Sequence, residues 1–519
     1  MPISQLGALN TAALVTPDAY IQIVPPSNQL LNGVPTNVLG IVGTSSWGPV
    51  NSPTTAGNIA QGAAIFGPQQ NRSNDLMTAV AAAVQQGANN FRLVRVTDGT
   101  DVAASVLVQS SCITFTSKYS GSFGNNIQVT VSAGTQTGTF KVVVAAPGLV
   151  SEAFDNIGLG LTANPLWVAI AGAINNGTNA LRGPSQIIVA TAGAGTTAPA
   201  VPTTYTLASG TDGVATIVTA TLIGVDTVPR KGMYALRNTG ASVAMLADLT
   251  DTTSFATQVT YGLSEGTYMV LATVSGDTIS NAATVKGTAG IDSPWAKYCF
   301  GDWIYWLDTV NSITRVLSPQ AFFAGLMANQ APNQSTLNKQ MQGIVGTQKS
   351  IANQQYSAAD LQQLGIAGID VITNPVPGGA YFGARFGHNS SSDPLRNGDN
   401  YTRMTNFIAA TLNVGMGKFI GLPQAANAIG VAGTPSANAQ ATLGTYFDNL
   451  QGQGLIGAVG GPIAYSVQID ANNNPQSRVA LGYLQADVAV QYQSIIEKLI
   501  VNLMGGTSVQ IQRSGVSLA

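Results

Sequence analysis

The sequence predicts an α/β (α+β) fold of several domains: a mixed-sheet core, an inserted and mostly β domain, and extended arms at both ends. Three observations predict this class. A buried, β-branched run starts at Val38, and a helical stripe and a second strand follow it before residue 97. Residues 105–222 then become rich in Thr, Ser, Gly and Val, with short alternating runs. The α/β pattern resumes at residue 223.

Size and composition limit the possible classes of protein. A chain of 519 residues is too long for one ordinary core, so we expect roughly two to four domains. Charged residues make up 8% of the chain, against about 25% in an average soluble domain. So few charges favour a surface largely covered by partners, although a surface solvated by Ser, Thr, Asn and Gln also explains them. The net charge is −2 and Arg230-Lys231 is the only adjacent basic pair, so no nucleic-acid-binding face is expected.

The first elements follow from residue periodicity. Residues 19–24 alternate like a short strand that ends at Pro25. Residues 75–86 carry apolar side chains at helical spacing, with Ser73 or Asp75 as the cap and Gly87 after the end. Residues 91–96 alternate as a strand. The run from Val38 to residue 96 is therefore a strand–helix–strand unit, and its two strands should be parallel.

The later elements are assigned in the same way. Inside the insert we expect strands at 127–131 and 139–144 and a helix near 165–175. Beyond it we expect a strand at 243–246, a helix from Phe255 to Leu263, a strand at 268–274 and a buried aromatic run at 298–307. A helix should begin near Asp399 as its N-cap, residues 424–442 should form a helix–loop connection, and 463–469 should pair with 478–492 as a hairpin. Residues 508–512 alternate as a last strand.

The sequence offers no catalytic, cofactor-binding or metal site. The single histidine, His388, lies in a serine-rich stretch, but no G-x-S-x-G elbow accompanies it, and a polar loop residue is the simpler interpretation. One histidine excludes two-histidine zinc motifs, and no phosphate-binding loop is found. Cys112 and Cys299 are expected to be buried free thiols. No secretory signal or membrane-spanning run is seen, which predicts synthesis and assembly in a cytoplasm.

Several motifs, in chain order, resemble the family of contractile tail sheath proteins of phages, pyocin-type particles and other injection systems. The resemblance starts at Pro17, Tyr20, Ile21 and Val24, with Ile23 where an acidic residue is usual. It continues through these segments: Val42-Gly43 with Gly48-Pro49-Val50-Asn51 and Pro53; Ser120–Asn125; Leu207, Gly210, Asp212 and Gly213; Ser318–Gly325; Leu364–Asp370; and Gly383-Ala384-Arg385. Ser209 and Phe386 depart from the family pattern.

The resemblance implies a structural subunit of a contractile tail sheath in a virion tail, not an enzyme. Such a subunit polymerises as stacked six-fold rings around a tail tube, between baseplate and tail terminator proteins. It contracts to drive the tube through a cell envelope, with energy stored in the lattice and without cofactor, nucleic acid or membrane insertion. The implied division is a linking arm at 1–24, a sheath domain at 25–104 with 223–380, an outer β domain at 105–222, an inner core domain at 381–505 and a second arm at 506–519.

Two sets of residues carry the expected contacts. Strand addition between copies would use the arms, through these residues: Tyr20, Ile21, Ile23, Val24, Val509 and Ile511. The resemblance places the C-terminal domain innermost, where these polar residues could face the tube: Arg396, Asn400, Arg403 and Lys418. For Arg385 we expect a structural role inside the domain, with a contact to a neighbouring copy as the alternative.

Other functions remain open at the level of sequence. An α/β binding or adhesin-type protein with a β recognition domain would behave as a stable monomer in size-exclusion chromatography. A hydrolase-like enzyme would require a pocket around His388. A sheath from a non-viral contractile injection system would share every motif given above.

Overall fold

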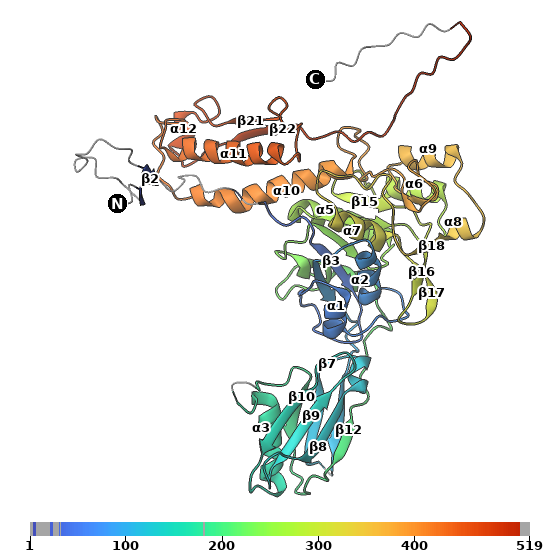
Figure 1. Ribbon diagram of the computed structural model, residues 1–519, viewed down its shortest axis with the longest axis vertical. Coiled ribbons are helices and arrows are strands. Elements are labelled where there is room, and N and C mark those ends of the chain that lie inside the picture. The colour runs from blue at the N-terminus through green and yellow to red at the C-terminus, as the bar shows by residue number, and fades with distance from the viewer. Residues whose placement is uncertain are drawn as a thin grey trace, which may run out of the picture.

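The computed structural model describes residues 4–6, 21–23, 31, 33–109, 111–179 and 182–508. It confirms the mixed α/β class, with several sheets and helices along one elongated chain (Figure 1). A β-rich unit lies at one end, an α/β layer lies in the middle, and two long helices lie at the other end. The domain boundaries assigned from the sequence stay a prediction.

The middle of the molecule is a six-stranded sheet. Its order is β15 (Ala296–Cys299), β14 (Tyr268–Ala272), β13 (Val243–Leu246), β3 (Leu39–Gly43), β5 (Phe91–Arg95) and β4 (Thr54–Ala56). All neighbouring pairs are parallel except β4 with β5. Every residue of β3 is buried, as expected for the central strand of a parallel sheet. The predicted strands at 38–42, 91–96, 243–246 and 268–274 and the parallel strand–helix–strand unit are thus confirmed.

Helices cover both faces of this sheet. On one face, Leu39 and Ile41 pack against α1 (Ile59–Phe66), α2 (Leu76–Gln85) and α7 (Gln320–Asn329). On the other face, Val42 packs against α4 (Thr219–Ile223), the turn at Gly232–Leu236 and α5 (Phe255–Glu265). Helices α6 (Ile279–Thr288) and α9 (Ala358–Ile366) extend that second layer over β14 and β15. The predicted helices at 75–86 and 255–263 are therefore confirmed.

Residues 103–206 form the β-rich unit. One sheet has the order β10 (Glu152–Ile157), β9 (Phe140–Ala145), β8 (Gln128–Ala133) and β12 (Thr203–Thr206); the other has β11 (Ile188–Ala192), β7 (Ile113–Ser120) and β6 (Ala103–Val108). Helix α3 (Ala163–Asn176) packs Trp167 and Ile170 into their common core. In the described ranges these strands pair only with one another and, through Ser105, with residue 208. The predicted strands at 127–131 and 139–144 and the helix at 165–175 are confirmed.

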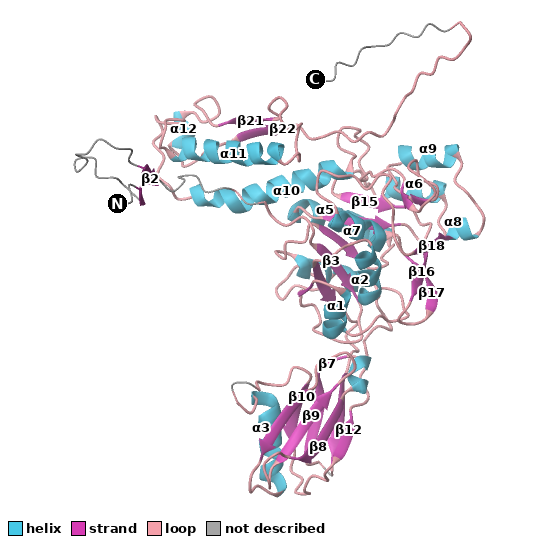
Figure 2. Cartoon of the chain, viewed as in Figure 1, coloured by secondary structure: helices cyan, strands magenta, loops and turns pink. Residues whose placement is uncertain are grey.

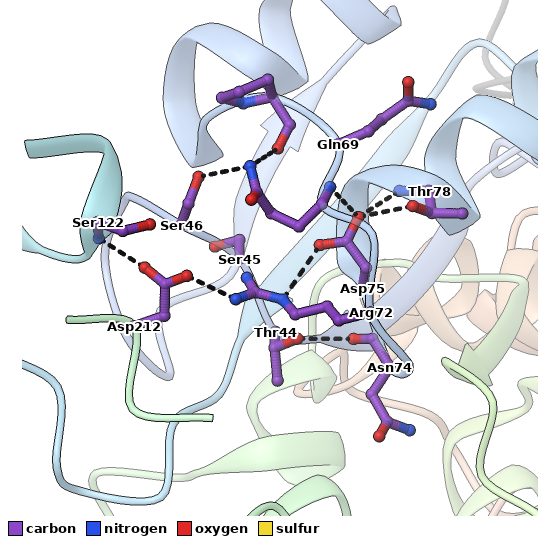
Figure 3. A network of polar contacts seen from close by, with 12 residues as sticks. Thr44, Ser45, Ser46, Gln69, Arg72, Asn74, Asp75, Thr78, Ser122 and Asp212 are labelled. Carbon is purple, nitrogen blue, oxygen red and sulfur yellow. Dashed lines mark hydrogen bonds and ion pairs between the residues drawn. The ribbon is translucent and has the colours of Figure 1, made fainter. Parts of the chain in front are cut away.

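Two arginines join the β-rich unit to the central layer, and Figure 3 shows the contacts of one of them, Arg72. Arg72 lies between Asp75, which caps α2 by accepting hydrogen bonds from Thr78, and Asp212, at 2.5 Å, which follows the β-rich unit and accepts from the backbone N–H of Ser122 within it. Arg95 is fully buried and donates to the carbonyl oxygens of Gly48, Ser120 and Asp212. Because Arg95 bonds to carbonyls of both units, it fixes their relative orientation.

The remaining elements complete the molecule. They are β16 (Ile304–Asp308), β17 (Ile313–Leu317), β18 (Ile344–Thr347), α8 (Gln348–Ile351), β19 (Ile372–Thr373), β20 (Gly383–Ala384), α10 (Asp399–Met416), α11 (Pro435–Gly452), β21 (Tyr465–Gln468), α12 (Gln476–Val479), β22 (Asp487–Val490), β1 (Ser4–Leu6) and β2 (Ile21–Ile23). Strands β16, β17 and β18 form an antiparallel sheet beside α7, and Tyr298, Phe300 and Trp306 of the aromatic run are buried. Figure 2 shows that no helix or strand follows β22 among the described residues, which end at residue 508.

The C-terminal half differs from the sequence expectation in two places. The region 424–442 contains the start of α11, because Thr434 and Pro435 supply a helix cap and a favourable first position and Leu443 and Phe447 give it a buried face. Asp399 is the first residue of α10 but not its N-cap, which is Gly398. Its carboxylate turns inward to a buried lysine, and this contact overrides local capping. The hairpin is confirmed, with shorter strands and α12 in its connection.

Replacing Asp75 by Asn should remove a pH dependence of folding. Burial, partly offset by the hydrogen bonds from Thr78, raises the pKa of Asp75 to about 6. The native state therefore holds this proton more tightly than the unfolded chain, so Asp75 lowers stability as pH rises from about 4 to about 6. Compared with Asp75→Asn, the wild-type free energy of unfolding should fall by up to ~3 kcal/mol across that interval. Urea unfolding at pH 4, 5, 6 and 7 measures it.

Asp155 provides the matched control on the surface of the insert. Hydrogen bonds from Thr135 lower its pKa, so it is ionised throughout this interval. In Asp155→Asn, the free energy of unfolding should fall between pH 4 and pH 7 as it does in the wild-type protein. An unchanged profile in Asp75→Asn would contradict the assignment.

Candidate subunit interface

The C-terminal part of the chain has the features of an interface. Helices α10 and α11 lie side by side (Figure 1), and the hairpin of β21 and β22 packs on α11. Tyr465 and Val467 alternate with exposed Ser466 and Gln468, so the hairpin buries one face against the helix. An α-helix below and a two-stranded sheet above form this layer.

Both edges of this hairpin are open within the described residues. Strands β21 and β22 pair with no other described strand, and two strands alone are only marginally stable in water. The N-terminal strands β1 and β2 make a second two-stranded sheet, parallel and separate from the others. Unpaired strand edges can accept a strand from another chain.

Gln493 marks the point where the chain leaves this layer. Its backbone carbonyl accepts from Asn400 at 2.9 Å, and its side-chain oxygen accepts from Asn333 at 3.1 Å. Its side-chain nitrogen donates to the carbonyl of Gly457 at 2.8 Å. Three segments of the chain thus hold one glutamine.

Beyond this anchor, residues 494–508 have neither helix nor strand and carry many exposed apolar side chains. The following are between 74% and 91% exposed: Ile496, Leu499, Ile500, Val501, Leu503 and Met504. An apolar run of this kind, exposed along an extended segment, is typical of a surface that a partner covers. Of the predicted arm, 506–519, only residues 506–508 lie within this described segment.

A buried ion cluster ties α10 to the central sheet. Lys297 of β15 is fully buried, and its Nζ donates to Asp370 Oδ2 at 2.6 Å and to Asp399 Oδ2 at 3.0 Å. Tyr268 donates to Asp399 Oδ1 at 2.6 Å, and Thr336 also donates to this carboxylate. Asp370 accepts from the backbone N–H groups of residues 386 and 387. One cation thus connects a strand, a loop and the first residue of α10.

The charges of this cluster stabilise one another. Burial lowers the pKa of Lys297, but the carboxylates of Asp370 and Asp399 more than offset this and raise it above its ordinary value. Burial raises the pKa of Asp399, and Lys297 outweighs that effect and lowers it. The pair therefore stays ionised at neutral pH, and its stabilisation is lost only as pH falls through the lowered pKa of Asp399 or rises through that of Lys297.

The predicted arm residues are placed in part. Ile21 and Ile23 lie in β2, which confirms a strand at this position, and β2 pairs with β1 of its own chain. These four residues lie outside the described ranges: Tyr20, Val24, Val509 and Ile511. Contacts of the arms with other copies stay a prediction.

The four predicted tube-facing residues divide into two pairs. Arg403 is buried and donates to the carbonyl oxygens of Gln330 and Ala331, and burial lowers its pKa to about 10. Asn400 is buried and bonds to Gln493. Arg396 is exposed and pairs with Asp393, and Lys418 is exposed beside the ring of Phe419. Of these four residues, only Arg396 and Lys418 place a charge on the surface of the chain.

The remaining chemical candidates have structural surroundings. His388 Nε2 lies 2.8 Å from Glu497 Oε1, and its ring stacks on Phe386. Cys112 and Cys299 are buried free thiols, as expected. Among the described residues, no group of three or more His, Cys, Asp or Glu side chains is arranged to hold a metal ion. In the same ranges, no helix combines the length and apolar character needed to cross a bilayer.

Sequence reasoning missed the ion cluster of Lys297. Asp370 and Asp399 lie 73 and 102 positions from the lysine, so no local spacing relates them. A signal exists in the strand itself, because Lys297 interrupts an apolar run between Trp295 and Phe300. A lysine in a fully buried strand requires a carboxylate partner.

Replacing Lys297 by Met should destabilise the protein by about 3–5 kcal/mol, because two buried carboxylates would lose their cation. Chemical denaturation at pH 7 measures the loss. Lys231 is an exposed lysine, and Lys231→Met is the matched control, which should change stability by less than about 0.5 kcal/mol. Equal stability of the two variants would contradict the role of the cluster.

Comparison with known proteins identifies this architecture. No protein-family model matches the chain, and no curated protein matches it. Among solved structures, a sheath tail protein from Desulfitobacterium hafniense is similar, with a TM-score of 0.57 and 15% identity over 86% of this chain and 93% of that one. A sheath tail protein from Listeria innocua gives a TM-score of 0.59 and 13% identity over 86% and 90%.

A third similar structure is the contracted-state PVC sheath complex of an extracellular contractile injection system. Its TM-score is 0.53, with 12% identity over 95% of this chain and 99% of that one. The chain therefore has the fold of tail sheath and injection-system sheath proteins.

Proposed function

We propose that this chain is the structural subunit of a contractile sheath, which polymerises helically around a tail tube and contracts to drive the tube through a cell envelope. The fold supports the proposal, because similar chains are sheath proteins and one of them belongs to a contracted sheath complex. The low charge content also supports it, since copies packed in a lattice need few charges to stay apart.

The observation that carries the proposal is the exposed apolar segment 494–508 next to an open-edged hairpin. Complete burial of one such side chain contributes about 1.5–3 kcal/mol, so the three apolar residues on one side of an extended strand offer about 5 kcal/mol or more to a partner surface. The open edges of β21 and β22 supply the matching hydrogen-bonding groups. We infer that the C-terminal arm of one copy adds to the hairpin layer of another, and that the N-terminal strands do the same.

Such a contact joins two different surfaces, so each copy gives an arm and receives one. A head-to-tail contact of this kind builds rings if its rotation closes and helical filaments if it does not. The anchor at Gln493 and the ion cluster of Lys297 keep each body rigid, while the segment without helix or strand links the bodies. Copies can then change their relative orientation during contraction without breaking the links.

The energy for contraction would be stored in the assembled lattice. The sequence has no phosphate-binding loop, and we propose that the extended lattice is kinetically trapped above a contracted one with better interfaces. The role proposed is structural and not enzymatic. A baseplate would trigger release, and a terminator protein would close the far end.

The tail tube is the proposed partner of the C-terminal layer. Of the four residues predicted to face the tube, Arg396 and Lys418 are both charged and exposed, and we propose them as tube contacts. The particle is either a phage tail assembled in a host cytoplasm or a non-viral injection system. The likeness to the PVC sheath keeps the non-viral injection system as an alternative to the phage tail.

Deleting residues 1–24 or residues 494–519 should abolish long sheath tubes, because each deletion removes one of the two proposed linking segments. Negative-stain electron microscopy of the purified chain, beside the full-length chain, measures tube length. Full-length tubes from either truncated chain would refute linkage through the arms.

A finer change tests strand addition in the described segment. In a strand, alternate residues face the same side, so Leu499, Val501 and Leu503 would face the partner together. Replacing all three by Ser should prevent polymerisation while the thermal unfolding of the monomer stays unchanged, since these side chains are already exposed. The matched control replaces Asn502 and Met504 by Ser on the opposite side, and it should still polymerise. Equal polymerisation of both variants would contradict the proposal that Leu499, Val501 and Leu503 face the partner.

A further inference from the structure

A cavity lies at the root of the C-terminal arm. Its volume is about 310 Å³, and its walls come from residues 385–388 after β20 and from residues 496–498 of the arm. Four charged or titratable side chains line it: Arg385, His388, Glu497 and Lys498. The cavity thus sits between the rigid body and the segment that leaves it.

Arg385 is unusual among the arginines of the described ranges. Each of the others has a hydrogen bond or an ion pair from its side chain, whereas the half-buried guanidinium of Arg385 has none. A guanidinium carries five N–H donors in a planar fork, and those of Arg385 remain accessible to solvent while meeting no acceptor among the described residues. Its position beside a cavity leaves the guanidinium available to an acceptor from outside these residues.

The other side chains leave the cavity positively charged. Lys498 also has no side-chain partner in the described part of the chain. The one carboxylate, Glu497, already contacts His388 at 2.8 Å. Two cations thus face a space in which the single anion is already engaged, and this space suits a carboxylate, which a guanidinium can bind through two parallel hydrogen bonds.

We propose that Arg385 and Lys498 form a binding pocket for an Asp or Glu side chain of a second copy of this chain. The inference rests on the proposed function, because it assumes that copies meet at the arm. Continuity with the arm supports a second copy, since a body that receives residues 499–504 must lie next to residue 498. Each copy also offers many carboxylates, with 23 Asp and Glu residues against 21 Lys and Arg. A nucleic acid is disfavoured, because two cations on a chain of net charge −2 give little affinity for phosphates.

The consequence for assembly is that the C-terminal arm leaves the body in a fixed direction. Lys498 belongs to the arm and Arg385 to the body, so one carboxylate bound by both would hold the first residues of the arm against the body. The pocket would be complete only in the polymer.

Zero-length cross-linking tests the pocket. A carbodiimide joins an amine to a carboxylate only when the two are in contact, and Arg385→Lys keeps the charge while adding an amine at position 385. Polymers are assembled from equal parts of ¹⁵N-labelled and unlabelled chains, checked by electron microscopy, cross-linked and digested. Mass spectrometry then identifies links between labelled and unlabelled copies.

We expect links between copies at position 385 in the Arg385→Lys variant and at Lys498 in the unaltered chain. Arg385→Gln, which has no amine, should lose the first link, and exposed Lys231 reports the background. Tubes that give no links between copies at either position, or give them only within one copy, overturn the pocket and leave the sheath proposal intact. If Arg385→Lys does not assemble, Lys498 of the unaltered chain decides alone. Absence of tubes from the unaltered chain overturns both proposals.

Discussion

The ion cluster around Lys297 is the constraint on which the C-terminal half depends. A charged lysine in a fully buried strand is tolerable only with its carboxylates in place, so Asp370 and Asp399 must arrive at the strand as the chain folds. Asp399 is the first residue of α10, and the position of that helix therefore follows from the charge of the sheet. Helix α11 and the hairpin pack on α10, so the position of α10 determines where they lie. One cation thus relates the central sheet to the surface through which copies are proposed to meet.

The molecule combines rigid bodies with segments that have no helix or strand. Buried arginines fix the β-rich unit to the central layer, and the lysine cluster fixes the helical layer on the other side. Past Gln493 the chain makes few contacts with its own body. A lattice subunit that rotates during contraction requires this combination, because the bodies must keep their shape while the links change direction.

Much of the fold could be predicted from sequence because its signals are local. The run from Val38, the stripe of α2 and the alternation of β8 and β9 each follow from spacing within a dozen residues. The failures share one cause. Asp399 resembles a helix cap in local sequence, but a lysine 102 positions away binds its carboxylate. The unpaired state of Arg385 is likewise invisible in sequence, because it depends on what the fold leaves nearby. Resemblance supplied the arms, and the structure alone shows that the exposed segment starts at residue 494.

The order of strands in the central sheet has a consequence for biosynthesis. Strand β3 lies between β5 and β13, which follow it by about 50 and 200 positions in the sequence. The insert, residues 103–206, is contiguous and can close both of its sheets as soon as it leaves the ribosome. One side of β3 therefore waits without its neighbour while the whole insert is translated. During that interval the nascent chain presents a bare, apolar strand, which makes it a substrate for chaperones and a site of misassembly between neighbouring ribosomes.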